Sequence, residues 1–257
     1  MRVKHIVSVS GGLSSSIVLD LVVKKYGQEN TVAVFCDTKT EDIDLYRFND
    51  DIKNLYPGIE WVTLCDGRTI WQLFEDKKFH GNNRIAPCSK YLKQEIFRKY
   101  LKSHSPEECI VYLGIGFEEM HRCDAITANS VPYVVIYPLI DWVKLMPKDK
   151  LEYFPNITPP RLYAMGFPHN NCGGLCVKTG QAQMRLLHDK LPETYAAHEA
   201  EQERIMNNNH NLCPFIRVTR NKVTRRLSLK EFRIQYIEPK TQIDENDWGG
   251  CGCFSDG

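Results

Sequence analysis

Short apolar segments alternate with helical segments through the first half of the sequence, and this alternation limits the folds open to the chain. Between the first two apolar segments, residues 14–25 carry Ile17, Val18, Leu21 and Val22 at helical spacing. Strands that alternate with helices predict an α/β fold in which a parallel twisted sheet carries helices on both faces. The strands that we predict are residues 5–9, 32–36, 59–64, 109–113 and 134–138.

The character of the sequence changes near residue 140. Pro, Gly and Cys gather between residues 159 and 180, and residues 195–206 are typical of a solvated helix. We therefore predict two units. A Rossmann-like domain covers residues 1–140, and a helical C-terminal extension that bears cysteines covers residues 141–257.

Charge and cysteine content narrow the function classes. Lys and Arg number 33 against 32 Asp and Glu, a net charge of +1, so no overall attraction to nucleic acid or membrane is expected. We see no signal peptide and no apolar run that could span a bilayer, and we expect a cytoplasmic protein without a membrane partner. In a reducing compartment, the ten cysteines predict metal binding or thiol chemistry rather than five disulfides.

A glycine and serine loop follows the first predicted strand. It runs Ser10-Gly11-Gly12-Leu13-Ser14-Ser15 and opens the first predicted helix. Glycines let the backbone approach a ligand, and backbone N–H groups at a helix start favour an anion. The alternative is a tight turn with a serine cap. The position after the first strand of an α/β pattern favours phosphate binding.

This loop resembles the PP-loop, Ser-Gly-Gly-x-Asp-Ser, of the adenine nucleotide alpha-hydrolase-like superfamily. That superfamily includes ATP pyrophosphatases, tRNA and DNA thiolation enzymes and PAPS reductases. Ser14 stands where ATP-cleaving members usually carry Asp, a position that varies more in PAPS reductase-like members. Further segments resemble the PAPS reductase-like family, in the same order along the chain. They are Phe35-Cys36-Asp37-Thr38, Pro87-Cys88-Ser89-Lys90-Tyr91-Leu92-Lys93, Leu113-Gly114-Ile115 with Arg122, and Tyr137-Pro138-Leu139-Ile140-Asp141-Trp142.

The resemblance implies a site for ATP or a related adenine nucleotide. Lys93 and Arg122 could meet phosphates or a sulfo group, although a single basic residue is more often solvated. Glu118 and Glu119 could hold Mg²⁺ or pair with arginine. Asp37 could bind ribose or adenine, or end a turn. The nucleotide-binding residues implied are Ser8, Ser10, Gly11, Gly12, Ser14, Ser15, Asp37 and Gly114.

Cysteines form a second group of candidates. Cys172 and Cys176 flank two glycines and a leucine, a spacing that lets two thiolates reach one metal site. In the resemblance, Cys88 is a third ligand, and the three would hold a [4Fe-4S] cluster; zinc is the alternative. Cys251 and Cys253 would close the fourth iron site or act as nucleophiles. Three cysteines in or beside strands are expected in the core: Cys36, Cys65 and Cys109.

Three functions follow as hypotheses. The first is ATP-dependent sulfur transfer, whose acceptor could be nucleic acid and whose donor a thiol or sulfur carrier protein. The second is a PAPS or APS reductase, although the Glu-Cys-Gly-x-His segment of assimilatory PAPS reductases is missing. The third is a nucleotide-binding module with structural zinc. The basic stretch 217–226 is more typical of a solvated face than of a phosphate site, and a homodimer is left open.

Overall fold

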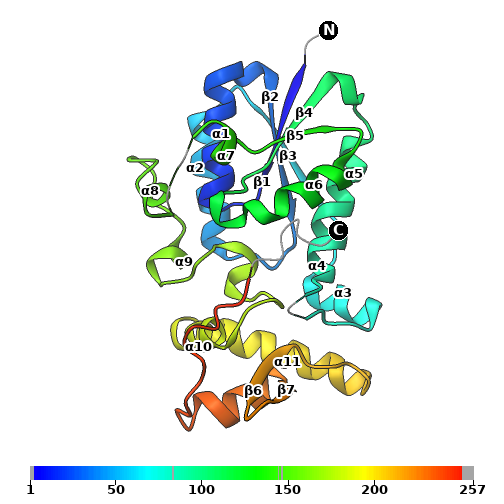
Figure 1. Cartoon of the computed structure of the whole chain (residues 1–257), viewed down its shortest axis with the longest axis vertical. Helices are drawn as coiled ribbons and strands as arrows, with labels where there is room; N and C mark the ends of the chain where they lie inside the picture. Colours follow the sequence, from blue (N-terminus) through cyan, green and yellow to red (C-terminus); the bar gives the residue numbers. More distant parts are fainter. Residues whose placement is uncertain (1–2, 83, 144, 146, 251–257) are drawn as a thin grey trace.

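A five-stranded parallel sheet forms the centre of the first half of the molecule (Figure 1). The computed structural model describes residues 3–82, 84–143, 145 and 147–250. The strand order is β3-β2-β1-β4-β5, and all four pairings are parallel, so the predicted α/β fold is confirmed. The strands are β1 Lys4–Val9, β2 Thr31–Asp37, β3 Glu60–Cys65, β4 Cys109–Tyr112 and β5 Val134–Ile136.

Helices cover both faces of this sheet because its central strands are apolar on both sides. Val7 and Ala33 face a cluster with α1 and α2, whereas Ile6 and Val34 face a second cluster with α5 and α6. Asp42 caps α2 by accepting a hydrogen bond from the backbone N–H of Asp44. The helices here are α1 Leu13–Tyr26, η1 Gln28–Asn30, α2 Ile43–Leu55, α3 Ile70–Lys77, α4 Pro87–Ser89, η2 Lys90–Glu95, α5 Ile96–Leu101, η3 Pro106–Glu108, η4 Phe117–Arg122, α6 Cys123–Ser130 and α7 Pro138–Asp141.

The C-terminal part from α10 onward forms a lobe below the sheet, whereas α8 lies beside α1 (Figure 1). It is mainly helical, but it also contains an antiparallel hairpin, β6–β7, that we did not predict from the sequence. Helix α11 is not fully solvated, because Tyr195 and Ile205 are buried on one face. The elements are α8 Pro147–Leu151, α9 Arg161–Ala164, η5 Asn171–Gly174, α10 Gln181–Lys190, α11 Pro192–Asn208, β6 Ile216–Arg220, β7 Val223–Leu227, α12 Leu229–Phe232 and η6 Arg233–Ile237.

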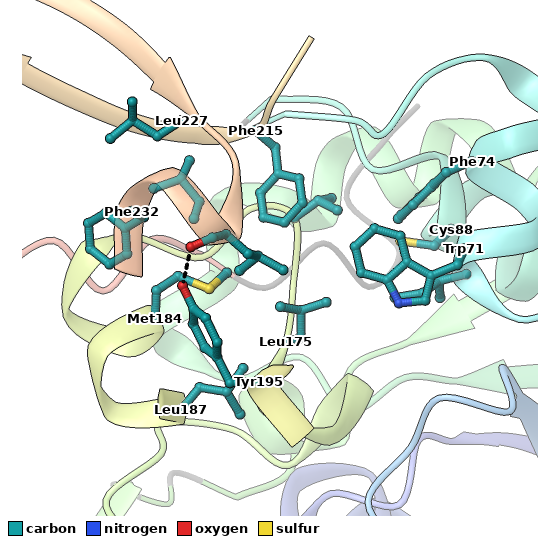
Figure 2. Close-up of a cluster of buried hydrophobic side chains, with 14 of the residues drawn as sticks. Trp71, Phe74, Cys88, Leu175, Met184, Leu187, Tyr195, Phe215, Leu227 and Phe232 are labelled. Atoms are coloured by element: carbon teal, nitrogen blue, oxygen red, sulfur yellow. Dashed lines mark hydrogen bonds between the residues drawn. The ribbon is translucent and has the colours of Figure 1, made fainter. Parts of the chain in front are cut away.

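A third hydrophobic cluster joins this lobe to part of the first half (Figure 2). Trp71 and Phe74 of α3 pack in it with Met184 and Phe215, and the hydroxyl of Tyr195 donates to the Leu229 carbonyl at 2.8 Å. Helix α3 was not predicted, and it packs against both α4 and the later lobe. The division at residue 140 stays a prediction, and the packing shows that the two parts share this core.

Candidate functional site

A cleft opens at the carboxyl end of the sheet, where the chain leaves β1 and β4. These strands are neighbours, but their connections run to opposite sides of the sheet, so the loops separate and leave a hollow. We call it the loop cleft; its volume is about 510 Å³. Its lining residues are Ser8, Ser10, Gly12, Ser14, Ser15, Leu113, Gly114, Ile115, Glu118, Glu119, His121, Arg122, Tyr163, Pro168, His169, Asn171, Trp248, Gly249 and Gly250.

The amino end of α1 forms one wall of the loop cleft. Its N-cap residue is Gly12, which has no side chain to cap the helix, and its first turn carries no acidic residue. Ser15 Oγ donates to the Gly12 carbonyl at 2.9 Å and accepts from the Ser10 N–H at 3.0 Å, so the loop is held together by its own serines. An uncapped helix start with its partial positive charge can bind a phosphate group.

Two glycines shape the loop cleft by allowing close contacts. Gly11 has a φ of +75°, and a Cβ there would lie 2.4 Å from Leu45 Cγ. A Cβ on Gly114 would lie 2.8 Å from the backbone nitrogen of Ser15. Glycine at residue 114 therefore lets the end of β4 touch the start of α1. Gly11 does not line the cleft, and its contribution is to the shape of the turn.

Charged side chains stand at one edge of the loop cleft. Arg122 donates to a Glu119 carboxylate oxygen, and Lys150 Nζ lies 2.5 Å from Glu118 Oε1. Burial on its own raises the pKa of Glu118, but the hydrogen bond and charge of Lys150, together with a backbone hydrogen bond, outweigh burial and lower the pKa. Sequence reasoning missed Lys150, because nothing in the local sequence links it to Glu118.

His169 also lines the loop cleft. Its Nδ1 is buried and has no hydrogen-bond partner among the residues that the structure describes. A buried polar atom without a partner is costly, so its position favours a ligand that supplies the missing group. The geometry at His169 is therefore a reason to consider ligand binding there.

The three candidate metal ligands lie in one neighbourhood, which we call the cysteine site (Cys88, Cys172 and Cys176). Burial, with a contribution from the nearby Cys176, raises the pKa of Cys88 to about 12. Burial likewise raises the pKa of Cys172, to which Cys176 and Cys88 also contribute. Thiols that affect one another's pKa are close in space, although Cys88 is far from the other two in the sequence. The cysteine site adjoins the loop cleft, because Asn171 lines that cleft and precedes Cys172.

A buried ion pair supports the cysteine site. Glu41 Oε1 lies 3.1 Å from Lys93 Nζ, and their side chains are 0% and 5% exposed. Glu41 also accepts from the Thr38 hydroxyl at 3.0 Å and from the Cys172 backbone N–H at 2.5 Å. Gly173, at a φ of +58°, lets the backbone next to Cys172 approach the Thr40 carbonyl. Lys93 is thus brought to the cysteine site and does not line the loop cleft, and sequence reasoning missed the role of Glu41.

Asp37 does not line the loop cleft either. Its Oδ1 accepts from the Lys39 N–H and from the Tyr46 hydroxyl, both at 2.8 Å, as expected for a residue that ends a turn. Its role in nucleotide binding stays a prediction. The other two candidates, Cys251 and Cys253, lie outside the described residues.

The chain just before those cysteines crosses the start of α10 and enters the loop cleft. Asp247 accepts from the Ala182 N–H with its carbonyl and from the Gln181 N–H with its carboxylate. Gly249 pairs with Thr179 in an isolated antiparallel bridge. We call residues 247–250 the tail crossing. Trp248, Gly249 and Gly250 all line the loop cleft.

The family model of the phosphoadenosine phosphosulfate reductase domain matches residues 4–168. This range holds all five strands of the parallel sheet and the motifs that pointed to this family. The chain belongs to this family. A search of the curated proteins found no match. The family match confirms the resemblance, while the reaction and the cluster are taken up below as proposals.

Three solved structures of PP-loop proteins are similar in fold. The phosphoadenylyl-sulfate (PAPS) reductase from Candida auris, in a phosphate complex, is 14% identical with a TM-score of 0.42, covering 64% of this chain and 78% of that one. The NH3-dependent NAD synthetase from Campylobacter jejuni, in complex with nitrate, is 12% identical with a TM-score of 0.40, covering 80% of this chain and 84% of that one. The U34-tRNA thiolase from Methanococcus maripaludis with its [4Fe-4S] cluster is 15% identical with a TM-score of 0.43, covering 79% of this chain and 73% of that one.

Two searches of the described residues bear on cofactors and partners. No three His, Cys, Asp or Glu side chains in these ranges are grouped as they would be around a single metal ion. No described helix is both long enough and apolar enough to cross a membrane.

Proposed function

We propose that this chain is a PP-loop enzyme that binds ATP in the loop cleft and transfers sulfur to an activated acceptor, with a [4Fe-4S] cluster held by Cys88, Cys172 and Cys176. The observation that carries the proposal is the convergence of these three thiols beside a cleft suited to phosphate. The cluster would supply an iron that can hold sulfur next to the bound nucleotide.

Three cysteine thiolates suit a [4Fe-4S] cluster, in which each would bind a different iron, and thiolates also suit zinc. Metal content distinguishes the two. Ligation requires the thiolate form, and the positive charge of Lys93 lowers the pKa of Cys88 and Cys172 against the effect of burial.

The loop cleft would carry out the activation step. Backbone N–H groups at the start of α1 would bind the phosphates, and Arg122 would offset the charge of departing pyrophosphate. An acceptor oxygen attacks the α-phosphorus and pyrophosphate leaves. A hydrosulfide ion then attacks the acceptor carbon, the carbon–oxygen bond breaks, and AMP leaves with the oxygen while the sulfur loses its proton. Ser14 lines a second hollow together with Glu118 and Lys150. Glu118 would therefore supply the carboxylate for Mg²⁺ that Ser14 does not.

Metal content of anaerobically purified protein tests the cysteine site. We expect about four iron and four sulfide per chain, and a loss of most of the iron in Cys172→Ser. Cys109→Ser, which changes a buried cysteine of β4, is the matched control and should keep its iron. Colourless protein with one zinc per chain would overturn the cluster and support a nucleotide-binding module with structural zinc.

Pyrophosphate release from labelled ATP tests the activation step. The anaerobic protein should release pyrophosphate when RNA or DNA is supplied, and Arg122→Gln should slow the release. If no nucleic acid elicits release while the nucleotide still binds, the chain does not activate an acceptor with ATP.

The tail crossing favours a second candidate, reduction of PAPS or APS. Cys251 follows Gly250, which lines the loop cleft. A tail thiolate would attack the sulfo sulfur and release the adenosine phosphate. A second thiolate, on Cys253 or on a thiol carrier, would then form a disulfide and release sulfite, so that two thiols are oxidised as the sulfur is reduced. Sulfite release from PAPS with thioredoxin would support this candidate, and its persistence in Cys251→Ala/Cys253→Ala would exclude the mechanism.

A further inference from the structure

The β6–β7 hairpin concentrates positive charge on an outward face. Ile216, Val218 and Leu227 point inward and are buried, so the alternate positions face away from the core. In the register of the hairpin, Arg217 lies directly opposite Arg226. From residue 217 to residue 226 there is no acidic side chain. Arg217 and Arg226 share the outward face, whereas Arg220 and Arg225 lie on the side that carries Val218, and Arg220 donates to the Gln242 carbonyl.

This arrangement is costly for the hairpin on its own. Like charges directly opposite each other on neighbouring strands are destabilising. Within the described residues, no carboxylate lies within salt-bridge distance of Arg217 or Arg226. Elsewhere, Arg47, Arg161 and Arg233 all contact carboxylates. Among the described residues Arg98 also has no carboxylate at salt-bridge distance, so it is the direct opposition of Arg217 and Arg226 that favours an anion from outside the chain at this face.

The outward face suits a row of phosphates better than a lipid surface. The hydroxyls of Thr219 and Thr224 lie 2.9 Å apart on the same side as the arginine pair and add neutral donors. The only large apolar side chain exposed on the described hairpin is Val223, near its tip. Membrane binding by such an element needs more apolar anchors, whereas a nucleic-acid backbone needs only donors and positive charge.

The hairpin is also connected to the loop cleft. A hollow of about 460 Å³ lies between the hairpin and the tail, lined by Arg217 and Thr219 on one side and Asp247 on the other. The next residue, Trp248, lines the loop cleft with its side chain 40% exposed. An exposed indole can stack on a nucleobase. The positive face, the hollow and the indole therefore follow one another toward the cleft.

We propose that the β6–β7 hairpin binds the phosphate backbone of a single-stranded nucleic acid and leads the strand along the tail crossing to the loop cleft. Binding of the phosphate backbone at the hairpin is inferred from the hairpin's geometry and does not depend on the proposed function. Delivery of a base to the cleft rests on the proposed function and identifies its acceptor as a nucleobase.

Fluorescence anisotropy with a labelled 20-nucleotide RNA and its DNA counterpart tests the proposal on the full chain. Arg217→Gln/Arg226→Gln should weaken binding about tenfold and should reduce the slope of log affinity against log salt by about 1.4, since each lost phosphate contact removes about 0.7. Arg98→Gln/Lys99→Gln, an equal change of charge on exposed positions of α5, should leave both unchanged. Trp248→Ala should weaken binding without changing the salt slope.

Several results would overturn the inference. These are no binding by the wild-type chain, equal losses in the hairpin and α5 variants, or equally tight hairpin-dependent binding of poly-glutamate or of vesicles with anionic lipid. Iron content and ATP binding of the hairpin variant should match the wild type. If the anaerobically purified protein contains no iron but still binds nucleic acid through the hairpin, the sulfur-transfer proposal fails and the hairpin inference stands.

Discussion

Glu41 and Lys93 form an ion pair shielded from water at the cysteine site, whereas Glu118 and Lys150 form one at the edge of the loop cleft with its carboxylate 45% exposed. The same contrast holds for the two sites as a whole. The loop cleft is formed by backbone amides, glycines and hydroxyls that water can reach. The cysteine site is formed by buried thiols next to a buried charge pair.

The difference indicates how each site responds to change. A cleft made of backbone groups depends on close approach and shape, and the loss of one of its side chains is partly compensated by solvent. A buried site depends on charges that must compensate one another, because an unpaired charge in the interior is expensive. Substitutions should therefore cost stability at the cysteine site and ligand affinity at the loop cleft.

The largest effect is expected from Glu41→Gln. The variant removes the charge that Lys93 contacts. Its single side-chain oxygen can accept from only one of Thr38 and Cys172, which donate to different carboxylate oxygens of Glu41. Breaking a buried pair on one side costs about 3 to 5 kcal/mol of unfolding free energy, which urea unfolding measures directly. A cost below about 1 kcal/mol would show that the pair behaves like a surface pair and would remove the contrast.

A smaller effect is expected from pH, through a histidine in the core that backs the cysteine site. Burial lowers the pKa of His198 to about 4, and its Nδ1 accepts from Trp71 Nε1 at 2.9 Å. The unfolded chain binds this proton near pH 6.5 and the folded chain only near pH 4, so stability falls as the pH falls through this window. Between pH 7.5 and 5.0 we expect a loss of about 2 kcal/mol from this group.

Urea unfolding at the two pH values checks this expectation in His198→Asn, whose side-chain oxygen can still accept from Trp71. The loss between pH 7.5 and 5.0 should shrink by about 2 kcal/mol in this variant. His210→Asn, at an exposed position, should retain the full loss. An unchanged loss in His198→Asn would assign the pH dependence to other groups.

At the loop cleft, Gly114→Ala should act on binding. The added Cβ would lie 2.8 Å from the Ser15 nitrogen, so the end of β4 must move away from the start of α1. Overpacking of this kind costs about 1 to 3 kcal/mol, and we expect ATP affinity, measured by calorimetry, to fall about tenfold while iron content is kept. In Gly58→Ala the new Cβ meets only the flexible side chain of Gln28, and affinity should not change.

The smallest effect is expected from Glu118→Gln. Lys150 is 7% exposed and loses its partner, but the carboxylate side of this pair is 45% exposed and water can take its place. The unfolding free energy should therefore fall by about 1 kcal/mol, less than at Glu41. Urea unfolding of Glu118→Gln and Glu41→Gln under the same conditions compares the two ion pairs directly. Equal losses of unfolding free energy would contradict the contrast between the two sites.

Sequence alone predicted the parts whose information is local. The five strands, the first helix and the glycine loop follow from runs of neighbouring residues, and the family match confirms the resemblance. The partners of Lys93 and Glu118 could not be predicted, because each contact joins residues far apart in the chain. Helix α3 was missed because its apolar residues face the distant C-terminal lobe. The β6–β7 hairpin was missed because its arginines hide the alternation of its buried residues.

The tail crossing has a consequence for the length of the chain beyond it. Cβ atoms on Gly180 and Gly249 would lie 2.1 Å from the Asp247 carbonyl oxygen and 2.3 Å from the Lys178 carbonyl oxygen, so the crossing admits little sideways shift. The crossing therefore fixes the position from which the following residues extend. Each residue after Gly250 adds at most about 3.6 Å of reach. One inserted or deleted residue there would therefore reset the range of both terminal cysteines while the crossing itself is unchanged.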